Sequence, residues 1–142
     1  MLYYDYQVLW SDLDANNHLR NTGYLDYASQ TRMRFLADHG FTPEAFARQR
    51  LGPIVFEDKV VYRKELRLLE PFRVSIETRG RSANGAKFIL VNRIYNQREE
   101  LCAEVQSHGA WFSLAERRIV EPPAELMAAM EAMPKTGDYA VF

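Results

Sequence analysis

Polar side chains that could transfer a proton or hold a reacting group are concentrated between Asp12 and Tyr24. The run is Asp-Leu-Asp-Ala-Asn-Asn-His-Leu-Arg-Asn-Thr-Gly-Tyr, and it joins a strand-like segment to the predicted start of a long helix. The first N–H groups of a helix have no intrahelical partners and lie at the positive end of its dipole, so this place suits a carboxylate or a developing oxyanion. A structural interpretation competes with this one, because Asp and Asn before a helix usually form caps and turns.

The elements that flank this run are predicted from residue type and spacing. Aromatic and β-branched residues predict a strand over residues 4–10. Apolar residues at three- and four-residue spacing predict a helix over residues 22–39, which Gly40 ends. Asn21 or Thr22 is expected to cap that helix.

The rest of the chain predicts an antiparallel sheet. Thr42-Pro43 begins a second short helix through Ala47 or Gln49. Four strand-like segments, expected to form a meander, then follow at residues 54–69, 72–82, 87–96 and 101–114. Pro122-Pro123 opens a terminal helix, and the last eight residues are expected to be a tail. We therefore predict one α+β domain over residues 1–142, in which about five antiparallel strands are covered on one face by the long helix.

Composition excludes several classes of function. The formal net charge of -1 provides no global attraction to nucleic acid or anionic membranes. No stretch approaches the roughly 20 apolar residues of a membrane span, so no span is predicted. The single Cys102 and the absence of Cys or His at ligand spacing predict no disulfide and no metal site. No phosphate-loop spacing is present either, so we expect no nucleotide cofactor. The single cysteine and the lack of an apolar targeting or spanning segment predict a cytoplasmic protein.

The polar run resembles the signature of hotdog-fold thioesterases of the 4-hydroxybenzoyl-CoA thioesterase type. Asp12-x-Asp14 and Asn21-x-x-Tyr24 match that signature, and the order of strand, long helix and four strands matches over nearly the whole chain. The resemblance implies a hotdog fold, in which the sheet wraps around the long helix.

Within that superfamily, the run is more similar still to plant-type acyl-ACP thioesterases. Those enzymes add Asn and His after the second Asp, which here are Asn16 and His18. A glutamate after a Tyr-Arg-Arg-type stretch is also implicated there, and residues 62–65, Tyr-Arg-Lys-Glu, resemble it less closely. This chain has one hotdog unit where the plant enzymes have two, so their specificity for an acyl carrier protein does not transfer.

The resemblance implies roles that the chemistry of thioesters makes sensible. Thioester hydrolysis needs an aligned nucleophile and oxyanion stabilisation more than a strong acid, because the thiolate leaves readily. Asp14 is then the nucleophile or general base. Asn16 and His18 would orient Asp14 or the attacking water, and Glu65 would approach from a neighbouring strand or subunit.

Other residues are expected to bind the substrate. The backbone N–H groups around Asn21 and Thr22 would form the oxyanion hole, and Tyr24 would contact the acyl group. Three basic residues flank the Asn-Gly turn of a predicted hairpin and could grip the phosphates of coenzyme A: Arg79, Arg81 and Lys87. The competing interpretation of these three is a solvated hairpin tip.

The expected activity is hydrolysis of an acyl-CoA or acyl-ACP thioester. Two alternatives remain open: a dehydratase or hydratase of acyl thioesters on the same fold, and a non-catalytic acyl-binding hotdog protein. The edge strands of an open sheet need protection, and a second copy of the chain would supply it by pairing edge to edge. A homodimer or homotetramer is therefore expected.

Overall fold

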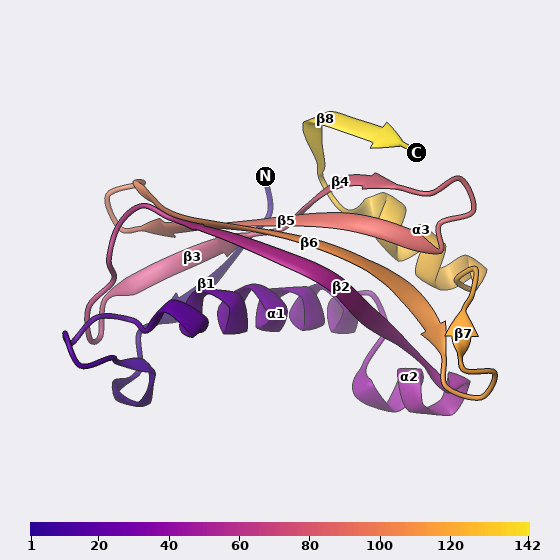
Figure 1. Cartoon of the computed structure of the whole chain (residues 1–142), viewed down its shortest axis with the longest axis horizontal. Coiled ribbons are helices and arrows are strands. Elements are labelled where there is room, and N and C mark those ends of the chain that lie inside the picture. Colours follow the sequence, from indigo (N-terminus) through magenta and orange to yellow (C-terminus); the bar gives the residue numbers. More distant parts are fainter.

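A curled sheet of eight strands wraps one long helix, α1 (Asn21–Asp38), in the computed structural model, which describes residues 1–142 (Figure 1). The strands are β1 (Tyr3–Gln7), β2 (Leu51–Tyr62), β3 (Pro71–Ser75), β4 (Glu77–Arg81), β5 (Lys87–Asn96), β6 (Leu101–Ser113), β7 (Arg118–Ile119) and β8 (Lys135–Val141). The shorter helices are α2 (Pro43–Gln49), α3 (Ala124–Ala132) and one 3₁₀ turn, Trp10–Asp12. The predicted α+β hotdog architecture is confirmed.

Helix α1 turns one face to the sheet. Tyr24, Ala28, Thr31 and Phe35, spaced four, three and four residues apart, are buried on that face. The helix begins one residue earlier and ends one residue earlier than predicted. The expected capping by Asn21 or Thr22 is wrong: the N-cap residue is Arg20, and no side chain caps the helix there.

The predicted meander is wrong, because β2 pairs with β6 rather than with the next strand along the chain. The sheet order is β2, β6, β5 and then β3 with β4, both of which pair with the same edge of β5. The strand predicted over residues 54–69 ends at Tyr62 because the following segment folds into the core, where Leu66 is fully buried. The strand predicted over residues 72–82 is divided in two at Ile76, which is also fully buried.

The last eight residues are not a tail, since β8 pairs in parallel with β4. Strand β8 passes so close to β4 that a Cβ atom on Gly80 would lie 2.5 Å from the carbonyl oxygen of Ala140. Glycine at this position is therefore required by close backbone approach. The parallel pairing escaped prediction because its register depends on α3, which carries the chain back to the sheet (Figure 1).

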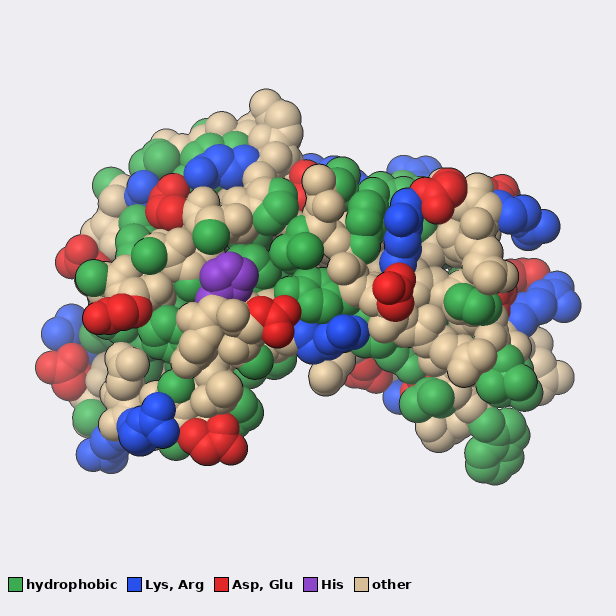
Figure 2. Space-filling view, turned by 180° about the vertical axis from the view of Figure 1, so that it is seen from behind, with side chains coloured by type: hydrophobic (Ala, Val, Ile, Leu, Met, Phe, Trp, Pro, Cys, Tyr) green, Lys and Arg blue, Asp and Glu red, His purple; other side chains and the backbone are tan.

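The surface shows no strong charge asymmetry on the face opposite that of Figure 1. Basic and acidic side chains are interspersed there with apolar ones (Figure 2). No helix is long and apolar enough to cross a membrane.

Candidate active site

The polar run forms a tight loop that Asp14 closes. Isolated bridges join Leu13 to Leu19 and His18 to Arg67, and the N–H of Asp14 donates to the carbonyl of His18 at 2.8 Å. The Oδ1 atom of Asp14 accepts the backbone N–H groups of Asn16 at 2.8 Å and His18 at 3.1 Å. Its Oδ2 atom accepts no hydrogen bond from the protein, and the side chain is exposed. The structural and the chemical interpretations of Asp14 are therefore compatible, because each uses a different oxygen.

An open pocket of about 300 Å³ lies between this loop, the start of α1 and the end of β2. Half of the predicted site residues line this pocket: Asp14, His18, Asn21, Tyr24 and Glu65. Three residues to which the sequence analysis gave no role line it as well: Tyr62, Arg63 and Lys64. The sequence did contain a signal for Tyr62, Arg63 and Lys64, because they precede Glu65 in the stretch that resembles the plant-type enzymes. The predicted interpretation assigned a role there to the glutamate alone.

The side chain of His18 does not contact Asp14. Its Nε2 atom lies 3.6 Å from Oε2 of Glu65, and the other oxygen of Glu65 lies 3.0 Å from Nη2 of Arg67. His18 holds Asp14 through its backbone instead, by its N–H and its carbonyl oxygen. Glu65 comes from the same chain, in the segment that follows β2.

The start of α1 leaves two N–H groups without a protein acceptor. The amides of Asn21 and Thr22 donate to no backbone or side-chain oxygen. The guanidinium of Arg20, the N-cap residue, lies beside them and donates to Oγ1 of Thr22 at 3.0 Å and to the carbonyl of Ser11 at 2.9 Å. Free amides beside a cation can stabilise negative charge on a carbonyl oxygen.

Two tyrosines fix the walls of the pocket. The hydroxyl of Tyr62, at the end of β2, donates to the carbonyl of Asn21 at 2.9 Å. The hydroxyl of Tyr24 donates to the carbonyl of Lys64 at 3.1 Å, and burial raises the pKa of Tyr24 to about 12. Tyr24 therefore stays protonated at neutral pH and uses its hydroxyl for structure, while its side chain lines the pocket.

A further contact anchors the loop to the helix. The hydroxyl of Tyr27 donates to Oδ2 of Asp12 at 2.5 Å, and burial, with this hydrogen bond, raises the pKa of Tyr27. The first aspartate of the Asp-x-Asp signature thus has a positioning role. Tyr27 lies 15 residues after Asp12, on α1, and the residue pattern of the sequence did not predict this contact.

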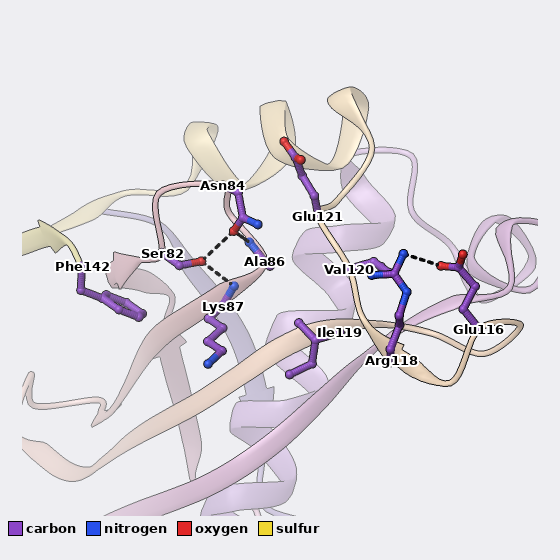
Figure 3. A pocket seen from close by; sticks show the side chains of 10 residues that line it. All are labelled: Ser82, Asn84, Ala86, Lys87, Glu116, Arg118, Ile119, Val120, Glu121 and Phe142. Carbon is purple, nitrogen blue, oxygen red and sulfur yellow. Dashed lines mark hydrogen bonds and ion pairs between the residues drawn. The ribbon is translucent and has the colours of Figure 1, made fainter.

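The basic hairpin residues do not join this pocket within one chain. Arg79 contacts Asp138 and Gln106, and Nε of Arg81 lies 2.7 Å from Oε1 of Glu131. Lys87 lines a different cavity of about 780 Å³ beside the Ser82–Lys87 turn and the ion pair of Arg118 with Glu116 (Figure 3).

The antiparallel sheet explains this separation. Tyr62 on β2 lies opposite Ala103 on β6, which in turn lies opposite Ile94 on β5. Lys87 begins β5, so it is about seven residues or roughly 23 Å from the strand position nearest the pocket. The loop and the hairpin lie at opposite ends of the molecule (Figure 1).

A second, apolar cavity of about 170 Å³ lies between α1 and the sheet. Its walls include Leu36, Val55, Phe88, Trp111 and Met130. Along α1, its polar wall residue Arg32 is about 11 residues or roughly 16 Å from Asn21. The apolar cavity and the polar pocket are therefore separate features of one chain. No group of three or more His, Cys, Asp or Glu side chains that could hold a metal ion is present.

Comparison with solved structures identifies similar folds. The chain superposes with a TM-score of 0.84 on a hypothetical protein, AQ1494, from Aquifex aeolicus, at 18% identity, covering 92% of this chain and 99% of that one. It superposes with a TM-score of 0.82 on SAV2348 from Staphylococcus aureus, solved in complex with CoA, at 18% identity and with 93% and 85% coverage. Slr0204, a 1,4-dihydroxy-2-naphthoyl-CoA thioesterase from Synechocystis, gives a TM-score of 0.80 at 16% identity, with 92% and 95% coverage. At these identities the likeness shows the hotdog fold.

Comparison with sequences identifies the family. None of the curated proteins matches the chain at a significant level. The family model of the thioesterase-like superfamily matches residues 8–130, which include the polar loop, α1 and every strand from β2 to β7. The chain therefore belongs to the thioesterase-like superfamily.

Proposed function

We propose that this protein hydrolyses an acyl-CoA thioester to a carboxylic acid and free CoA thiol. One observation carries the proposal: Asp14, whose Oδ2 atom is free, and Asn21, whose amide has no protein acceptor, line the same open pocket. The amide of Thr22, also without an acceptor, follows directly on α1. Membership of the thioesterase-like superfamily and the CoA complex of a structural relative support thioester chemistry and a CoA substrate.

In the proposed reaction, the amides of Asn21 and Thr22 donate to the thioester carbonyl oxygen. Asp14 either attacks the carbonyl carbon or removes a proton from a water molecule that attacks it. The tetrahedral intermediate then collapses, the C–S bond breaks, and the thiolate leaves and takes up a proton. If Asp14 is the nucleophile, water hydrolyses the resulting anhydride in a second step.

His18 and Glu65 are proposed to assist this step. Their side chains lie 3.6 Å apart at the pocket wall. The imidazole of His18 would pass a proton to the leaving thiolate. Asn16, whose backbone holds Asp14, would orient the attacking water with its exposed amide.

A second copy of the chain is proposed to complete the site. Strand β2 is twelve residues long, and in one chain its outer edge has no strand partner. Its apolar side chains Val55 and Phe56 are 48% and 56% exposed, which is a liability for an unpaired edge. Antiparallel pairing of two β2 strands would bring the Leu51 end of one copy, whose Pro53 and Val55 line the apolar cavity, toward the Tyr62 end of the other. The acyl group would then enter one copy while its thioester lies in the pocket of the other.

The test is release of free thiol from acyl-CoAs. The purified protein is incubated with acyl-CoAs that differ in chain length, with an acyl-ACP as a separate arm, and a thiol-trapping dye records the product. We expect hydrolysis by the native protein and by the control Asp5→Asn, whose exposed carboxylate lies on β1 outside the pocket. We expect almost none from Asp14→Asn.

Other outcomes would contradict the proposal. Acyl-CoA binding without thiol release would indicate an acyl-binding protein, and hydration of an enoyl thioester without thiol release would indicate a hydratase. Hydrolysis of acyl-ACP but not of acyl-CoA would show that the substrate is carried by an acyl carrier protein and not by CoA.

A further inference from the structure

A charged residue of α1, Arg32, is half-buried against the sheet, away from the polar pocket. The guanidinium of Arg32 donates from Nε to Oδ1 of Asn92 at 2.9 Å and from Nη2 to Oγ of Ser107 at 2.6 Å. The hydroxyl of Ser107 donates in turn to Asp58, the residue opposite it on β2. A polar row thus crosses β5, β6 and β2 on the face that α1 covers.

This row divides the interior. One apolar cluster surrounds Phe35 and Trp111 near α2 and α3, and a second surrounds Tyr24 and Val74 near the polar loop. Burying a guanidinium is unfavourable unless it is paired, and replacing buried ionic groups with apolar residues of similar volume is often neutral or stabilising. Burial lowers the pKa of Arg32 to about 10, against the opposing effect of Asp58, so the side chain is still a cation at neutral pH.

The polar row leaves hydrogen-bonding capacity unused at the wall of the apolar cavity. Nη1 of Arg32, a lining residue, donates to no protein acceptor. The indole N–H of Trp111, which lines the same cavity and is 1% exposed, is buried without a partner. A buried donor without a partner, such as the indole N–H of Trp111, is rare and costly. An acceptor oxygen on a bound molecule could satisfy this N–H and also accept from the unused Nη1 of Arg32.

The cavity also limits the size of its occupant. Its volume is about 170 Å³, close to an engineered cavity of about 150 Å³ that holds benzene, a molecule of six carbons. A chain of about six carbons fits such a space, whereas a long fatty acyl chain does not.

We propose that Arg32 is a specificity-determining residue that selects short acyl groups carrying an oxygen acceptor near their far end. This proposal rests on the proposed function, because Arg32 would select the acyl group whose thioester the same site hydrolyses. Asp58, joined to Arg32 through Ser107, already offsets the guanidinium charge. The acceptor favoured is therefore a neutral hydroxyl or keto oxygen rather than a carboxylate.

The test compares three thioesters of equal carbon number. Hexanoyl-CoA has no terminal acceptor, 6-hydroxyhexanoyl-CoA has a neutral one, and adipoyl-CoA has a carboxylate. We expect kcat/KM to be highest for the hydroxyl compound. For Arg32→Met, we expect the ratio of kcat/KM for 6-hydroxyhexanoyl-CoA to kcat/KM for hexanoyl-CoA to fall by at least about tenfold. This factor corresponds to the loss of one charge-assisted hydrogen bond.

Binding is measured separately so that recognition does not depend on hydrolysis. S-hexyl-CoA and S-(6-hydroxyhexyl)-CoA are thioethers that cannot be hydrolysed, and isothermal calorimetry gives their dissociation constants. We expect the native protein to prefer the hydroxyl compound and Arg32→Met to lose the preference. The control Arg34→Met, on the face of α1 that contacts Tyr4 and Tyr6, should keep it.

The possible results separate the two proposals. A thioether preference that depends on Arg32, without thioester hydrolysis, would keep this inference and refute the hydrolase. An equal decrease of kcat/KM for all three thioesters in Arg32→Met would refute the inference. A native protein that prefers hexanoyl-CoA or adipoyl-CoA would refute it too. If Arg32→Met does not fold, Arg32→Lys, which keeps the charge but not the planar fork, takes its place and should also reduce the preference.

Discussion

The Oδ1 atom of Asp14 accepts the backbone N–H of His18 at 3.1 Å and so closes the loop that carries both residues. This contact divides the carboxylate: one oxygen holds the loop, and the other borders the pocket without a protein partner. A substitution that keeps the first oxygen and removes the charge can therefore separate structure from chemistry.

Asp14→Asn is expected to preserve the loop and abolish most activity. The amide oxygen can accept the same two N–H groups, so the melting temperature should hardly change. Loss of the charge should lower kcat by roughly two to four orders of magnitude, the scale of general-base catalysis. Asp14→Ala should also lose about 1 kcal/mol of the free energy of unfolding, because both loop hydrogen bonds disappear. If a steady-state assay gave Asp14→Asn the same kcat as the native protein, Asp14 would have a structural role only.

His18→Ala should lower turnover less than Asp14→Ala. The imidazole contacts Glu65 rather than Asp14, so its removal leaves the nucleophile or base in place. Steady-state kinetics of the two variants provide the comparison. The reverse order of losses would move the central role to His18.

Disruption of the β2 edge should dissociate the oligomer. Phe56→Asp places a charge at the exposed centre of β2, where we propose that two copies pair. Leu114→Asp, at a similarly exposed apolar residue outside β2, is the matched control. Light scattering at micromolar concentration should show a dimer or tetramer for the native protein and the control, and a monomer for Phe56→Asp. An active native monomer would refute the oligomer.

Acid should remove the stabilisation that Glu100 provides. Its hydrogen bonds to Lys64 and Asn96 lower the pKa of this carboxyl from 4.5 to about 2. A lowered folded-state pKa stabilises the protein above pH 4.5, and the effect disappears as the pH falls to about 2. Urea unfolding should find Glu100→Gln less stable than the native protein at pH 7 and equally stable near pH 2. A difference that does not depend on pH would mean that the charge is unimportant.

Gly109→Ala should destabilise the sheet. A Cβ atom there would lie 2.5 Å from the carbonyl oxygen of Ile54 and 2.7 Å from the ring of Phe88. Relieving such overlaps typically costs about 1–3 kcal/mol. Gly52→Ala, where the added Cβ would meet no atom within 4 Å, should have little effect. Thermal unfolding of both variants checks this, and equal melting temperatures would contradict the packing described.

The sequence by itself determined the elements whose residue patterns are local. The three- and four-residue spacing from Tyr24 to Phe35 predicts α1 to within a residue at each end, because helical periodicity depends on neighbours in the chain. The strand over residues 87–96 is bounded by turn residues and matches β5. The polar loop between a strand and a helix was also evident, since its composition forbids regular structure.

Only the tertiary structure decided which segments pair and which side chains meet. The end of β2 at Tyr62 depends on Leu66 entering the core, and the strand β8 depends on the return of the chain through α3. The contacts of His18 with Glu65 and of Arg32 with Ser107 join residues 47 and 75 positions apart. Such contacts result from packing of distant surfaces, which leaves no periodic signal along the chain.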